Sequence, residues 1–120
     1  MLIYVAGPYS APTEPERVEN VNAAIRVGLK LMQRGHVVVI PHLTHYTDAI
    51  ARDEMGWEVP YEEWMRQDFA LLDRCDALFL VGHSPGADRE LERAAAGRKA
   101  IFVTMDRVPV VAVPSKAIRE

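Results

Sequence analysis

The chain has 120 residues, of which 49% are hydrophobic and 26% charged, and its formal net charge is −3. This length predicts one domain over residues 1–120, and the weak negative charge argues against a nucleic acid polymer as partner. The sequence has no apolar run of membrane-spanning length, so no membrane partner is expected. The single cysteine, Cys75, cannot form an intrachain disulfide, which indicates a reducing, cytoplasmic location.

The first 40 residues predict a strand, a helix and a second strand. Residues 1–6 are apolar and predict a buried strand. A capping box at Thr13-Glu-Pro-Glu16 begins a helix that extends to about Arg34, and residues 36–40 predict the next strand. The apolar stripe expected on this helix is Val18, Val21, Ile25, Leu29 and Met32. The three elements form a βαβ unit with a right-handed crossover.

Residues 41–60 have weak periodicity but contain several histidines and aromatic residues. They predict a short helix near residues 47–54, with a long loop making up the rest. Loops of that length in a compact domain are usually functional or disordered, and the aromatic content argues against disorder. Residues 60–74 then predict another helix.

Residues 77–97 predict a buried strand, a tight turn and a helix. Five apolar residues, Ala77–Val81, precede a turn at Gly82–Gly86. Ser84 fits the N-cap of the following helix, Pro85 its first position and Gly97 the residue past its end. This arrangement places free backbone N–H groups and a positive helix end at the edge of a sheet.

Residues 99–104 predict a fourth strand, and residues 108–113 a fifth at a sheet edge, since Pro109 cannot donate to a ladder. Alternating strands and helices indicate an α/β protein with a small doubly wound parallel sheet of four to five strands, flavodoxin/Rossmann-like with order 2-1-3-4-5. A binding crevice then opens between the ends of the first and third strands, at Ala6–Ser10 and Gly82–Gly86.

The polar groups expected at this crevice favour acid–base or nucleophilic chemistry. Glu90 lies about one and a half turns into its helix, close enough to face a ligand bound at the turn. The sequence lacks the Walker and G-x-G-x-x-G patterns, so ATP and dinucleotides are disfavoured and no cofactor is expected. His42 and His45 have no third ligand at metal spacing, so no metal is expected. The candidate site residues are Tyr4, Gly7, Pro8, Tyr9, Ser10, His42, Asp68, Ser84, Gly86, Asp88 and Glu90.

Three segments carry a family resemblance. They are Ile3-Tyr-Val-Ala-Gly-Pro8, Gln67-Asp-Phe-Ala-Leu-Leu-Asp-Arg-Cys-Asp76 and Ser84-Pro-Gly-Ala-Asp-Arg-Glu-Leu-Glu-Arg-Ala94. In this order they resemble the motifs of the nucleoside 2-deoxyribosyltransferase family, which includes 2'-deoxynucleoside 5'-monophosphate N-glycosidases. The resemblance covers roughly residues 2–104.

The resemblance implies an enzyme that cleaves or exchanges the N-glycosidic bond of a (deoxy)nucleoside or nucleoside 5'-monophosphate. It implies that Glu90 attacks C1', that Tyr4 holds the Glu90 carboxylate, and that Asp68 assists proton transfer. Ser84 and the Gly86 N–H would meet the 5' end. The family's transferases tend to carry an aspartate where Ser84 stands, so the serine favours a monophosphate.

Four of the candidates could also have a purely structural role, without any part in chemistry. Glu90 could be an exposed residue paired with Arg89 or Arg93. Asp68 could pair locally, Tyr4 could be a core aromatic, and His42 a solvated or core histidine. A second functional hypothesis is a catalytically silent nucleotide-binding or sensing module on the same fold.

A homo-oligomer, either a dimer or a tetramer, is also expected. Trp57, Tyr61 and Trp64 are large apolar side chains that a domain of this size would bury in a subunit interface.

Overall fold

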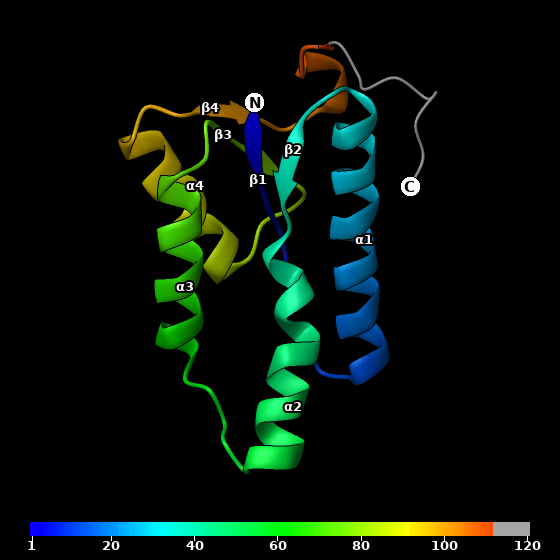
Figure 1. The fold of residues 1–120 in the computed structure, drawn as a ribbon, viewed down its shortest axis with the longest axis vertical. Helices are drawn as coiled ribbons and strands as arrows, with labels where there is room; N and C mark the ends of the chain where they lie inside the picture. Colours follow the sequence, from blue (N-terminus) through cyan, green and yellow to red (C-terminus); the bar gives the residue numbers. More distant parts are fainter. Residues whose placement is uncertain (112–120) are drawn as a thin grey trace, which may run out of the picture.

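A four-stranded parallel sheet forms the centre of the structure, a computed structural model that describes residues 1–111 (Figure 1). The strand order is β2-β1-β3-β4, and all three pairings are parallel. This confirms the predicted α/β class with a small doubly wound sheet. The strands are β1 (Leu2–Ala6), β2 (Val37–Val39), β3 (Ala77–Leu80) and β4 (Ala100–Phe102).

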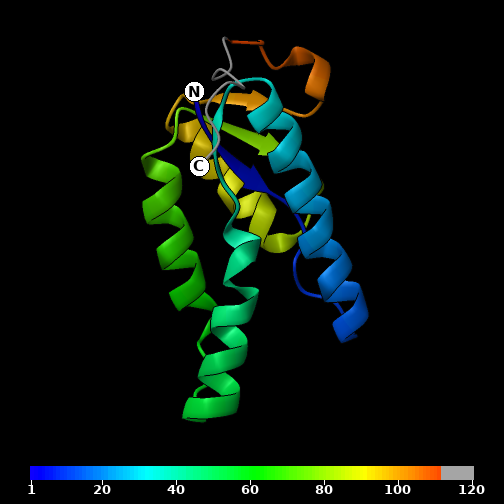
Figure 2. The same ribbon diagram turned by 45° about the vertical axis from the view of Figure 1, so that its right-hand side comes forward.

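Helices cover both faces of the sheet (Figures 1 and 2). Helix α1 packs on one face, against β1 and β2, and α4 packs on the other, with α3 beside it. Helix α2 extends beyond the carboxyl ends of the strands. The helices are α1 (Glu14–Gln33), α2 (His45–Met55), α3 (Tyr61–Asp73) and α4 (Pro85–Ala96), with short 3₁₀ turns η1 (Pro41–Thr44) and η2 (Met105–Arg107).

The two central strands form the core because both of their faces are covered. Every residue of β3 and residues 3–6 of β1 are buried. Successive side chains of a strand point to opposite faces of the sheet. In β1, Ile3 and Val5 pack with α1, whereas Tyr4 and Ala6 pack with α3 and α4. Among the described residues, no helix is long and apolar enough to cross a membrane.

The two predicted N-caps, Thr13 and Ser84, are both present. The Thr13 side chain accepts a hydrogen bond from the Glu16 N–H at 3.3 Å, and Ser84 accepts one from the Ala87 N–H at 3.1 Å. A proline follows each cap, where its missing N–H costs no helical hydrogen bond. Helix α4 ends at Gly97, as predicted.

The stripe predicted for α1 is wrong in part. Val18, Leu29 and Met32 are exposed, while the residues that face the sheet are Val21, Ala24, Gly28 and Leu31. The small residues are inside because α1 lies very close to β2. A Cβ atom at Gly28 would come within 2.5 Å of Ile40 Cδ1.

Two further predictions need correction. Residues 41–55 form a nearly continuous helical segment, η1 followed by α2, and not a long loop around a short helix. The buried residue of α2 is Ala51, whereas its larger apolar residues Tyr46 and Ile50 are exposed, so the sequence pattern does not mark the full extent of the helix. The fifth strand is absent at residues 108–111, because Val108 turns into the α1-side core; residues 112–113 lie outside the described part of the chain.

Candidate active site

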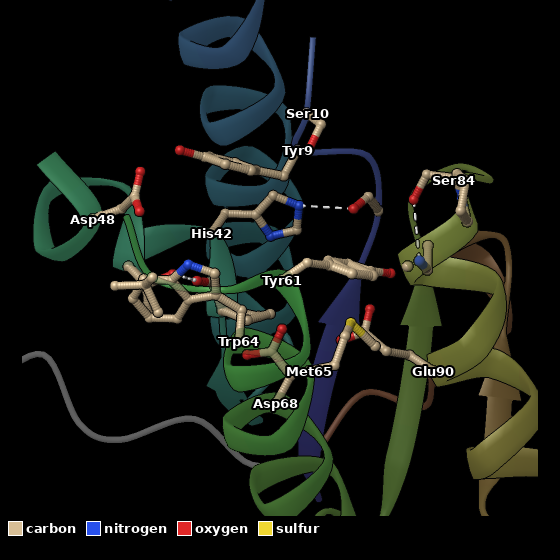
Figure 3. A pocket seen from close by; sticks show the side chains of 17 residues that line it. Tyr9, Ser10, His42, Asp48, Tyr61, Trp64, Met65, Asp68, Ser84 and Glu90 are labelled. Atoms are coloured by element: carbon tan, nitrogen blue, oxygen red, sulfur yellow. Dashed lines mark hydrogen bonds between the residues drawn. The ribbon is translucent and has the colours of Figure 1, made fainter. Parts of the chain in front are cut away.

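The loops after β1 and β3 meet at the carboxyl edge of the sheet. The two strands are neighbours, and the Val81 N–H donates to the Ala6 carbonyl at 2.7 Å. A Cβ atom on Gly7 would lie 2.9 Å from Val81 Cβ, so glycine lets the loops approach. Beside them is a cleft of about 420 Å³, closed on its other sides by η1, α2, α3 and α4 (Figure 3).

Glu90 forms part of the cleft lining although it is only 5% exposed. It occupies the buried stripe of α4 between Ala87 and Ala94. The hydroxyl of Tyr4, itself fully buried, donates a hydrogen bond to Glu90 Oε2 from the strand beneath. Tyr4 therefore does not line the cleft but supports a residue that does.

The interpretation of Glu90 as an exposed ion-pair partner is wrong. Arg89 instead makes two hydrogen bonds to Glu62 at 2.9 and 3.0 Å, and Arg93 makes two to Asp73 at 2.7 Å. These contacts join α4 to α3 on the outside of the cleft. They leave the Glu90 carboxylate with Tyr4 as its hydrogen-bond donor.

Asp68 is the second carboxylate of the cleft. It lies on α3 between the buried residues Met65 and Leu72, so the helical period turns it inward. The local-pairing interpretation does not hold for Arg66, which instead pairs with Glu63 at 2.7 Å. Figure 3 shows Asp68 and Glu90 on facing helices, both directed into the cleft.

Burial changes the ionisation of Glu90, Asp68 and Tyr4. It raises the pKa of Glu90 to about 7; the Tyr4 hydrogen bond opposes the rise and the charge of Asp68 adds to it. Burial also raises the pKa of Asp68 to about 6, against the effect of the Tyr4 hydroxyl. Burial and the two carboxylates raise the Tyr4 pKa far above its usual value, so this phenol stays a donor. Near neutral pH the pair can hold one proton and one charge, which suits acid–base work. Because the pKa of Glu90 is the higher of the two, the form with an ionised Glu90 and a protonated Asp68 is the minor one-proton form.

The start of α4 forms one end of the cleft. Ser84, Pro85, Gly86 and Ala87 all line it. A Cβ atom on Gly86 would lie 3.3 Å from the Tyr61 hydroxyl, so this turn also contacts α3 closely. The first turn of α4 presents partial positive charge and the Gly86 N–H, since Pro85 has no N–H and the Ala87 N–H is donated to Ser84; this suits an anionic group.

The opposite end of the cleft is formed by η1, α2 and the loop that follows β1, called the first loop below. The Tyr9 hydroxyl lies 2.7 Å from His45 Nδ1, and His45 Nε2 lies 3.0 Å from Glu14 Oε1. The buried His42 holds the first loop by donating from Nε2 to the carbonyls of Gly7 and Pro8, both at 3.1 Å. Burial lowers the pKa of His42, so its ring is neutral.

Most of the predicted site residues meet in this cleft, but three do not line it. Tyr4 lies beneath it, Pro8 contributes only its carbonyl to His42, and Asp88 is exposed with its carboxylate 2.6 Å from His83 Nδ1. The predicted residues that line the cleft are Gly7, Tyr9, Ser10, His42, Asp68, Ser84, Gly86 and Glu90.

Sequence reasoning missed much of the wall formed by η1, α2 and α3. The aromatic and acidic content of residues 41–64 was the available signal, but which of them face the cleft depends on helix packing. Within residues 1–111 no group of three or more His, Cys, Asp or Glu residues is arranged to hold a metal ion. The missed lining residues are Pro41, Thr44, Asp48, Val59, Tyr61, Trp64, Met65, Pro85 and Ala87.

Residues 1–104 match the family described as a domain of unknown function (DUF7768), and the chain belongs to this family. The matched range contains all four strands and every residue that lines the cleft. No match to a curated protein was found.

Proposed function

We propose that this protein cleaves or exchanges the N-glycosidic bond of a (deoxy)nucleoside or nucleoside 5'-monophosphate, with Glu90 as the nucleophile. The observation that carries the proposal is the buried Glu90 carboxylate in the cleft, which accepts a hydrogen bond from Tyr4 and faces a second carboxylate on α3. Glycosidases commonly use two carboxyl groups on either side of the bond that they cleave, and their reaction passes through an oxocarbenium-like state.

In the first step, Glu90 attacks C1' while the bond from C1' to the base nitrogen breaks. The base leaves with that electron pair and takes a proton from the Asp68 carboxyl group. Tyr4 donates to the Glu90 oxygen that is not attacking, which keeps the carboxylate oriented beneath the sugar. The burial of the Glu90 carboxylate strengthens its attraction to the developing positive charge at C1'.

In the second step, an acceptor attacks C1' and displaces the Glu90 oxygen. When the acceptor is water, the Asp68 carboxylate takes its proton and the product is the free sugar or sugar phosphate. When the acceptor is another base, the Asp68 carboxylate takes the proton of the attacking ring nitrogen and the product is a new nucleoside or nucleotide. Both outcomes return Glu90 to its ionised form and Asp68 to its protonated form.

The 5' end of the substrate is assigned to the start of α4. Ser84 is neutral and already caps the helix, so it adds no charge that would repel a phosphate. In the first turn Pro85 has no N–H and the Ala87 N–H is donated to Ser84, so the Gly86 N–H is the backbone donor left for an anion. These features favour a 5'-monophosphate over a free nucleoside.

The test is a base-release assay. The protein is incubated with a panel of deoxynucleosides and their 5'-monophosphates, and free base is measured by chromatography. Release from at least one member supports the proposal, and a swapped nucleoside on addition of a second base identifies a transferase. Binding without release from any member would instead support the sensing module.

A further inference from the structure

The cleft has two chemically different ends. Glu90 and Ser84 lie on the α4 side, while Tyr9 and Asp48 lie on the far side near α2 (Figure 3). Trp64 lines the cleft between these ends and offers a flat face. A sugar held over Glu90 with its 5' end at Ser84 therefore directs its base towards α2.

The Tyr9 hydroxyl at this far end is left as a hydrogen-bond acceptor. The Glu14 carboxylate can only accept, so His45 Nε2 carries the hydrogen of their 3.0 Å contact. When Nδ1 carries no hydrogen it has a lone pair and accepts the Tyr9 hydroxyl hydrogen, the two atoms lying 2.7 Å apart. The Tyr9 oxygen retains only lone pairs for a ligand.

Two residues of η1 have the same character. Thr44 Oγ1 donates its hydrogen to the Pro41 carbonyl at 2.8 Å, which leaves its lone pairs. His42 uses its Nε2 hydrogen on the first loop, so Nδ1 is an acceptor. This Nδ1 is buried and has no hydrogen-bond partner among residues 1–111, an arrangement that is unfavourable unless a donor is supplied.

Asp48 completes the set. Arg52 donates to its Oδ2 at 3.2 Å, and Oδ1 has no hydrogen-bond partner in the part of the chain that the structure describes. A carboxylate offers acceptors only. Tyr9, Thr44 and Asp48 thus present acceptors at this end of the cleft. Ser10 has a hydroxyl that can donate or accept, and Trp64 adds one donor, its indole N–H.

We infer that this end of the cleft selects a nucleobase with an exocyclic amino group, cytosine or adenine, over the corresponding oxo base. The inference rests on the proposed function, which fixes the direction of the base. An amino group supplies two hydrogens to the acceptors of Tyr9 and Asp48, and the ring nitrogen beside it can accept from Trp64. An oxo group would place its lone pairs against those acceptors, and its ring N–H would replace the acceptor that Trp64 needs.

The experiment compares matched pairs that differ only in this group: deoxycytidine with deoxyuridine, and deoxyadenosine with deoxyinosine, each also as the monophosphate. We expect kcat/KM for base release to be at least about tenfold higher for the amino member of a pair. Equal or higher values for the oxo member would overturn the inference and leave the proposed function standing. Absence of release from every member would overturn the proposed function.

Binding provides a readout that does not depend on catalysis. In the Glu90→Gln protein, we expect the amino member of each pair to bind at least about tenfold more tightly by calorimetry. Equal dissociation constants would contradict the inference even where wild-type protein releases base.

Asp48→Asn supplies an amide donor where the wild type has an acceptor, so the amino preference should fall at least about fivefold. Asp53→Asn is the matched control, because Asp53 is also on α2 beside Arg52, at 3.4 Å, but does not line the cleft. An Asp48→Asn preference equal to that of the control would remove Asp48 from the recognition set and overturn the inference.

Discussion

The Tyr4 hydroxyl donates a hydrogen bond to the Glu90 carboxylate across 86 positions of sequence. Tyr4 belongs to a central strand and Glu90 to the helix that covers it, so the contact joins the core directly to the cleft. The bond requires the phenol to remain protonated, and the raised pKa of Tyr4 ensures this at any working pH. A buried donor thus fixes the orientation of a buried carboxylate.

Glu90→Gln should fold normally and lose at least about 100-fold in kcat, because an amide retains the shape and the Tyr4 contact but cannot attack C1'. Glu92→Gln is the matched control. It lies two residues away on α4 with an exposed side chain, and it should retain wild-type activity. A Glu90→Gln protein with most of its activity would exclude this residue as nucleophile.

The rate should depend on pH as a bell with its maximum between about pH 6 and pH 7. Activity requires an ionised Glu90, whose pKa is raised to about 7, so the rate falls at lower pH. It also requires a protonated Asp68, whose pKa is raised to about 6, so the rate falls at higher pH.

Tyr4→Phe should move this profile as a whole. The Tyr4 hydroxyl lowers the pKa of both Glu90 and Asp68, so its loss should raise both values and move the acid and the alkaline limb to higher pH. Measurement of both proteins with the same substrate cancels any titration of a substrate phosphate. An unchanged acid limb in Tyr4→Phe would argue that this limb does not report Glu90.

The free energy of unfolding should depend on pH because the ionised Glu90 carboxylate is buried. Because folding raises the Glu90 pKa from 4.5 to about 7, the folded state binds more protons than the unfolded state in this interval. Wild-type stability therefore falls as pH rises through it, and the penalty is fully present above about pH 7.

Glu90→Gln removes that penalty. Its unfolding free energy should exceed that of wild type at pH 8 by up to about 3 kcal/mol, and the gain should vanish near pH 4.5. Urea unfolding at both pH values measures this difference. A gain of equal size at both, or in Glu92→Gln as well, would contradict the assignment to a buried charge.

We expect the protein to form a homo-oligomer through the exposed apolar side of α2. Tyr46 and Ile50 lie one turn apart and are 71% and 53% exposed, and Trp57 follows at 49%. Sedimentation should give at least twice the 13.5 kDa chain mass, with Ile50→Asp shifted towards the monomer. Asp53→Asn, on the same helix, should sediment as wild type. A monomeric wild type at micromolar concentration would contradict this expectation.

For residues 41–64 the sequence did not predict the extent of α2 or which side chains face the cleft. Apolar spacing is the main signal for a helix and for the side that it buries. In α2 the buried residue is Ala51, whereas the apolar Tyr46 and Ile50 are exposed, so the spacing does not indicate the side that faces the cleft. The sequence therefore predicts a helix shorter than α2 and does not show the cleft wall that α2 forms with α3. The α1 stripe failed for a related reason: this helix has apolar residues on two sides, and only close packing on β2 selects the side with Gly28.

The sequence by itself determined the four strands of the sheet but not the absence of a fifth at residues 108–111. It also determined the caps at Thr13 and Ser84 and the convergence of the two loops, because these follow from local hydrogen bonding and from the connection rules of parallel sheets. Helical spacing even places Glu90 between Ala87 and Ala94 on one stripe. Only the tertiary structure decided that this stripe faces Tyr4 and that Asp68 opposes it. Burial and proximity set the charge state of a carboxylate, and both depend on residues that are distant in sequence.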